Sequence, residues 1–114
     1  MTWDKVAEKA MAQLTVDERR NGVLYLDQRE LAPNSLVSID GRDVQVRTAS
    51  AMAFVDQEPR ANWGHACRYM LIDLAGGGVT SIPAQFPPYL RHVPAELHVV
   101  FKGEAVPDWT VAKP

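Results

Sequence analysis

The chain of 114 residues has a single cysteine, Cys67, which excludes an intramolecular disulfide. It has no excess of basic residues, and its net charge of −2 argues against contacts with the phosphates of a nucleic acid. Its apolar runs are far shorter than a membrane span, and its N-terminus lacks the basic and apolar segments of a secretory signal. We therefore expect a cytoplasmic protein that binds neither nucleic acid nor a membrane.

The composition is typical of a small soluble globular protein. Hydrophobic residues make up 46% of the chain and charged residues 23%, which provides enough apolar material for one core. We expect a single domain over residues 1–114. It would consist of an N-terminal helix at 3–14, a β-rich body at 23–102 and an irregular C-terminal tail at 103–114.

The first segment has the period of an amphipathic helix. Thr2 is a suitable N-cap, and Asp4 suits the positive end of the helix dipole. Thr15 and Glu18 have the spacing of a capping box, which predicts a second, short helical turn that ends at Asn21-Gly22. The apolar stripe of the first helix consists of Trp3, Val6, Ala7, Ala10, Met11 and Leu14.

After Gly22 the pattern changes to short strands separated by turn residues. Such spacing predicts a mainly β, α+β fold: an antiparallel β-sandwich or barrel of about six to eight short strands with one N-terminal helix. Asp40-Gly41 is a strong signal for a two-residue hairpin turn. The strands are expected at 23–26, 36–39, 43–47, 51–55, 68–74, 79–82 and 97–101. The turn pairs Ile39 with Arg42, which places Val37, Ile39, Val44 and Val46 on one face.

Two segments, 56–66 and 83–94, lack strand periodicity and combine proline or glycine with aromatic residues. Long ordered loops in a compact domain are commonly functional, and aromatic residues and arginine are enriched at the centres of interfaces. We therefore predict a small non-catalytic module that binds a protein or peptide through these loops. Self-association as a homodimer, through a sheet edge or the apolar stripe of the helix, is also open. The predicted binding residues are Trp63, His65, Arg68, Phe86, Tyr89 and Arg91.

A cysteine-dependent hydrolase or transferase is the alternative from another functional class. A thiolate nucleophile needs an imidazole nearby and a third group that orients the ring. Cys67 and His65 are two residues apart, so on an extended strand they would share a face, and Asn62 or Asp73 would orient the histidine.

A metal- or small-ligand-binding barrel is the second alternative. The candidate ligands are His65, Cys67, His92 and His98, which together would supply the nitrogen and sulfur donors of a tetrahedral site. Their spacing matches no established metal motif, so the preferred prediction includes no cofactor.

Overall fold

The computed structural model describes residues 1–90 and 92–112. Within them the chain begins with two α-helices, α1 (Trp3–Ala12) and α2 (Val16–Asn21), and ends with a short 3-10 helix, η1 (Asp108–Thr110). Seven strands lie between these helices: β1 (Val23–Leu31), β2 (Leu36–Ile39), β3 (Arg42–Gln45), β4 (Ser50–Asp56), β5 (Cys67–Asp73), β6 (Val79–Ala84) and β7 (Leu97–Lys102).

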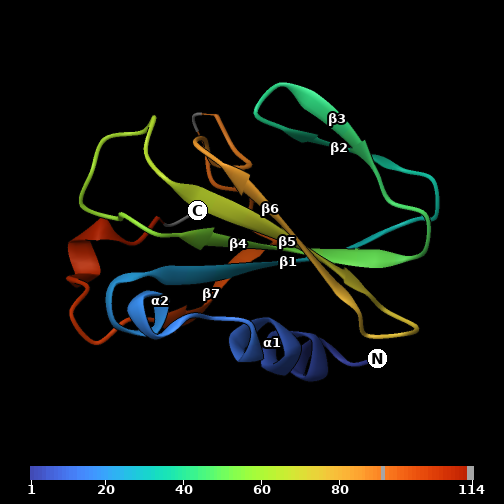
Figure 1. The fold of residues 1–114 in the computed structure, drawn as a ribbon, viewed down its shortest axis with the longest axis horizontal. Coiled ribbons are helices and arrows are strands. Elements are labelled where there is room, and N and C mark those ends of the chain that lie inside the picture. The colour runs from blue at the N-terminus through green and yellow to red at the C-terminus, as the bar shows by residue number, and fades with distance from the viewer. Residues whose placement is uncertain (91, 113–114) are drawn as a thin grey trace.

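In the described part of the chain, five strands form one antiparallel sheet in the order β6-β5-β4-β1-β7. The strands β2 and β3 form a hairpin in the connection between β1 and β4. Figure 1 shows α1 on one side of the sheet and this hairpin on the other. The mainly β, α+β architecture expected from the sequence is confirmed, with an open sheet and a small second sheet rather than a closed barrel.

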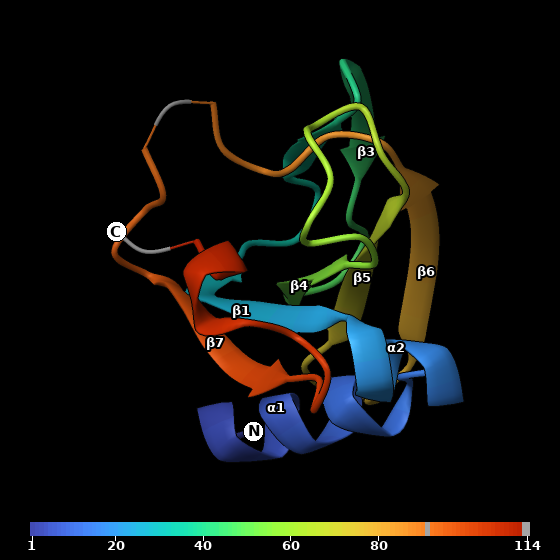
Figure 2. The same ribbon diagram turned by 90° about the vertical axis from the view of Figure 1, so that its left-hand side faces the viewer.

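Alternation along the strands divides the core into two layers. On the helix side, α1 packs on the small and aliphatic residues Leu24, Leu26, Ala51, Ala53, Val55, Met70 and Ile72. On the other side, which we call the loop side, larger residues are buried, including Tyr25, Ile39, Phe54, Tyr69 and Leu97. Figure 2 shows both helices beneath the sheet and the long loops above it. The candidate site lies on the loop side.

The hairpin prediction is confirmed. Ile39 pairs with Arg42 and Val37 with Val44, as the two-residue turn requires. Asp40 and Gly41 both have positive φ, 52° and 76°, which is the conformation of a type I′ turn. Because this register turns the apolar face inward, Ile39 is fully buried in the loop-side core.

Several boundaries differ from the sequence-based expectations. The helix expected at 3–14 ends at Ala12, although Leu14 is still buried against the sheet. Pro83 lies inside β6, not in a loop, because β6 is an edge strand and an edge tolerates a residue without an N–H donor. The two loops therefore cover residues 57–66 (the first loop) and 85–96 (the second loop).

The apolar stripe of α1 packs against the sheet and does not form a free surface. Val6 and Ala10 in its stripe are fully buried against the sheet, so that stripe is not available for self-association. Among the described residues, no helix has the length and apolar character needed to cross a bilayer.

Candidate functional site

The two loops and the hairpin turn meet at one place on the loop side. The backbone N–H of Gly64 in the first loop donates to the carbonyl of Gln85 in the second, at 3.3 Å. The carboxylate of Asp40, in the hairpin turn, accepts hydrogen bonds from the backbone N–H groups of Gln85 and Phe86, at 2.9 and 3.1 Å. Three segments that are distant in the sequence are thus connected by hydrogen bonds.

Side chains of these segments line an open pocket of about 680 Å³, within the range of small-ligand pockets. Its floor includes Tyr69 of β5, whose hydroxyl donates to the carbonyl of Phe86 at 2.9 Å. The backbone of Phe86 is therefore held on both its N–H and its carbonyl. The pocket is lined by Ser38, Asp40, Gly41, Trp63, Tyr69, Phe86, Pro87, Pro88, Tyr89 and Leu90.

The predicted binding residue Trp63 lies at the centre of an aromatic cluster. Its ring centroid is 5.8 Å from Phe54 in the core and 6.4 Å from Tyr89, whose ring is nearly perpendicular at 88°. The indole is 37% exposed, so it links the buried core to the pocket surface. The structure thus brings Trp63, Tyr89 and Phe86 together.

His65 supports Trp63 from within the protein. The imidazole is buried and stacks on the indole with ring centroids 4.2 Å apart. Its Nδ1 lies 2.8 Å from the carbonyl oxygen of Asn62, so Nδ1 carries a proton and donates it. Its Nε2 lies 2.7 Å from Oδ1 of Asp56. A hydrogen bond at that position needs a further proton, carried either by the ring or by the carboxyl group.

Burial raises the pKa of Asp56, and the hydrogen bond from His65 opposes that effect. The contact of Nε2 with the buried carboxyl group, together with that of Nδ1 with the Asn62 carbonyl, fixes the orientation of the ring. Gly64 has a φ of 93°, which allows the chain to turn between Trp63 and His65 so that the two rings stack. Asp56 was not among the predicted site residues, since its contact with His65 depends on this turn.

The geometry does not provide a cysteine nucleophile. His65 precedes β5 and uses both ring nitrogens on Asn62 and Asp56, and the Cys67 thiol instead faces the carbonyl of Phe86 at 3.7 Å. Burial, reinforced by the charges of Asp40 and Asp56, raises the pKa of Cys67 to about 12. Such a thiol stays protonated at neutral pH and is a poor nucleophile.

The proposed metal ligands are not assembled. Among the described residues, no group of three or more histidine, cysteine, aspartate or glutamate side chains has the geometry to hold a metal ion. His92 and His98 are exposed, whereas His65 and Cys67 are buried with the partners given above.

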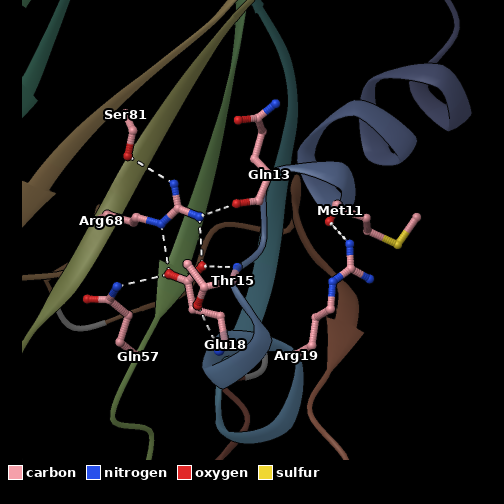
Figure 3. A network of polar contacts seen from close by, with 8 residues as sticks. All are labelled: Met11, Gln13, Thr15, Glu18, Arg19, Gln57, Arg68 and Ser81. Carbon is pink, nitrogen blue, oxygen red and sulfur yellow. Dashed lines mark hydrogen bonds and ion pairs between the residues drawn. The ribbon is translucent and has the colours of Figure 1, made fainter.

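The structure places Arg68 away from the pocket, contrary to the predicted surface. Successive residues of a strand point to opposite faces, so Arg68 faces the helix side while Cys67 and Tyr69 face the loop side. Figure 3 shows its guanidinium bound to Glu18 of α2, to Ser81 and to the carbonyl of Gln13. Arg91, the other predicted basic residue, lies outside the described residues.

Arg68 and Glu18 form the centre of a polar network that anchors α2 and the start of the first loop. The two side chains make two hydrogen bonds of 2.7 Å, and Gln57 donates to Glu18 at 2.9 Å. Thr15 and Glu18 form the predicted capping box. Burial alone would raise the pKa of Glu18, but the hydrogen bonds from Arg68, Thr15 and Gln57 outweigh it and lower the pKa to about 2.

Several residues that line the pocket were not among the predicted binding residues, and three of them bear on its shape and exposure. Asp40 was read only as a turn residue, although its carboxylate holds the second loop. Tyr69 was not among the predicted binding residues, although strand alternation alone places it on the face opposite Arg68. Leu90, fully exposed beside Tyr89, had no sequence signal beyond its loop position.

Comparisons of this chain with family models, with curated proteins and with solved structures give no match. The class that the fold defines is an α+β domain with an open antiparallel sheet. The pocket on the loop side is the feature that bears on its function.

Proposed function

We propose that this protein is a small non-catalytic binding module, which recognises a segment of a partner protein or a peptide in the aromatic pocket. The observation that supports the proposal best is the convergence of both loops and the hairpin turn on this one pocket. The proposed setting is the cytoplasm. Self-association through a sheet edge stays a prediction, for which β7 is an edge strand.

The pocket exposes apolar side chains on ordered backbone. Phe86 is 50% exposed and Leu90 fully exposed, and they flank the partly exposed Trp63 around the same pocket. Single exposed apolar residues are common, but adjacent ones around a concave site are typical of binding surfaces. Large aromatic side chains supply much of the binding free energy in such surfaces.

The pocket is also held in shape before any ligand arrives. Asp40 fixes the backbone of Gln85 and Phe86, and Tyr69 fixes the carbonyl of Phe86. The next two residues are Pro87 and Pro88, whose own φ angles are fixed by their rings. A site that is already ordered loses little conformational entropy on binding, so its contacts count more fully toward affinity.

The proposal is tested by selecting ligands from a random peptide library displayed on phage, with the purified protein as the target. A selected peptide is then synthesised and its dissociation constant measured by isothermal titration calorimetry. Trp63→Ala should weaken binding by roughly 2 kcal/mol or more, about thirtyfold, because truncation of a central aromatic residue typically costs that much. Trp109→Ala is the matched control, since Trp109 is exposed in η1 and does not line the pocket.

Trp63 also contacts Phe54 in the core, so Trp63→Ala changes the core packing as well as the pocket. Phe86→Ala serves as a second variant, because the side chain of Phe86 is half exposed. It should weaken the same peptide while leaving the circular dichroism spectrum unchanged. The proposal is wrong if no selected peptide loses affinity in either pocket variant, or if Trp109→Ala weakens binding as much as Trp63→Ala does.

A further inference from the structure

The charge of the pocket points to the chemistry of its ligand. Its described lining contains aromatic rings, prolines and one ionisable carboxylate, that of Asp40, and no basic side chain. An apolar ligand would be suited to the rings alone. The carboxylate at the edge gives the pocket a negative charge that an apolar ligand would leave without a partner.

Asp40 has no basic partner among the described residues. The ion pairs of the described chain involve other carboxylates. Its two oxygens accept backbone N–H groups of the second loop, which orient the carboxylate but do not neutralise it. A carboxylate oxygen has two acceptor positions, so each oxygen retains capacity for a further donor.

The charge of Asp40 extends into the pocket. Burial is the largest cause that raises the pKa of Tyr69 on the pocket floor, and the negative charge of Asp40 adds to it. The other carboxylate nearby, Asp56, is paired with His65 behind the indole. Asp40 is thus the carboxylate in this region that a ligand can still match.

The rings around Asp40 suit a cation as well. Organic cations bind against the faces of aromatic rings, with tryptophan the strongest partner. The rings of Trp63 and Tyr89 stand nearly perpendicular, which gives the pocket two walls in different planes. Tyr69 and Phe86 contribute to the same lining. Rings and a carboxylate together are the groups that recognise an alkylammonium or guanidinium ion.

We infer that the pocket binds the basic side chain of an arginine or lysine in the partner segment, with the rings of Trp63 and Tyr89 against it and Asp40 as its counter-ion. This inference rests on the proposed function and specifies which side chain enters the pocket. Recognition by aromatic faces and one carboxylate selects for positive charge and against acidic or neutral polar side chains.

The test compares a selected peptide with a neutral analogue in which citrulline replaces arginine, or norleucine replaces lysine. We expect the neutral analogue to bind about tenfold more weakly, since a charge-assisted contact beside aromatic rings is commonly worth that factor. Arginine methyl ester is titrated separately, and its binding without a peptide would show that the pocket takes a free organic cation too.

Asp40→Asn removes the charge and suits the turn, because asparagine tolerates positive φ. In this variant the charged peptide and its neutral analogue should bind with nearly equal affinity. Asp43→Asn is the matched control: Asp43 is exposed in the same hairpin outside the pocket, and this variant should keep the tenfold preference. An unchanged preference in Asp40→Asn would overturn the role of Asp40.

The outcomes separate the two proposals. Selected peptides that need the pocket but bind equally well as neutral analogues would overturn the cation inference and leave the peptide-binding module intact. Absence of any peptide that depends on Trp63 or Phe86 would overturn the proposed function, and the inference with it. A basic residue shared by the selected peptides, together with the loss in the neutral analogue, supports both.

Discussion

The buried pair of Glu18 and Arg68 gives the sharpest prediction about stability. Glu18→Gln replaces the carboxylate by a neutral group of the same shape, so it mimics permanent protonation. The pKa of Glu18 falls from 4.5 to about 2 on folding, and each tenfold change in proton affinity is worth about 1.36 kcal/mol. The substitution should therefore lower the free energy of unfolding by about 3 kcal/mol at neutral pH.

The lowered pKa of Glu18 also predicts how the loss of stability in Glu18→Gln depends on pH. A carboxylate whose pKa is lowered on folding contributes stability above its unfolded value, and this contribution disappears as the pH falls from 4.5 towards about 2. The difference between wild type and Glu18→Gln should shrink over that range. Urea unfolding followed by circular dichroism at several pH values measures it.

Glu8→Gln is the matched control for Glu18→Gln. Glu8 lies on α1 with an exposed side chain and a long ion pair to Lys5 at 3.5 Å. Such surface pairs contribute little, so this variant should change stability by less than about 0.5 kcal/mol at any pH. An equal loss in both variants, or a loss in Glu18→Gln that stays constant down to acid pH, would refute the account of the network.

Two further predictions concern the packing. Gly103→Ala should destabilise the protein by about 1–3 kcal/mol, because a Cβ there would clash with the carbonyl of Arg20. Gly78→Ala, where a Cβ meets open space, should cost much less. Urea unfolding compares the two variants, and equal losses of stability would contradict this account of the packing at Gly103. The Cys67 thiol, with its pKa raised to about 12 by burial, should react slowly with a thiol reagent in the native protein and rapidly in urea. Fast labelling of the native protein that His65→Ala abolishes would favour the enzyme alternative instead.

The secondary structure was predictable where local chemistry decides it. Asp40-Gly41 selects a type I′ turn by its backbone preferences alone, and the turn then fixes the register of β2 and β3. Thr15 and Glu18 specify the start of α2 in the same way. The place of Pro83 was not predictable in this way, because a proline is excluded from the interior of a sheet but not from an edge strand, and sequence alone does not give strand order.

The candidate site was only partly predictable. Trp63, Phe86 and Tyr89 were found because aromatic residues in proline-bearing loops are conspicuous in a sequence. Asn62 was correctly expected beside His65, although its backbone carbonyl and not its side chain makes the contact. Glu18 and Asp56 were not predicted as partners, since Glu18 is 50 positions from Arg68 and Asp56 reaches His65 only through a turn at Gly64. Contacts between distant segments depend on the tertiary fold, which local patterns do not specify.

The central claim is that a partner segment binds in the pocket between the two loops and the hairpin turn. The most direct measurement is a two-dimensional nitrogen–proton NMR titration of the labelled protein with a selected peptide. The account predicts that the largest shifts occur at the Trp63 indole and at the backbone amides of Gly41, Phe86 and Tyr89. Shifts concentrated instead along β7 or on α1, with these signals unmoved, would contradict it.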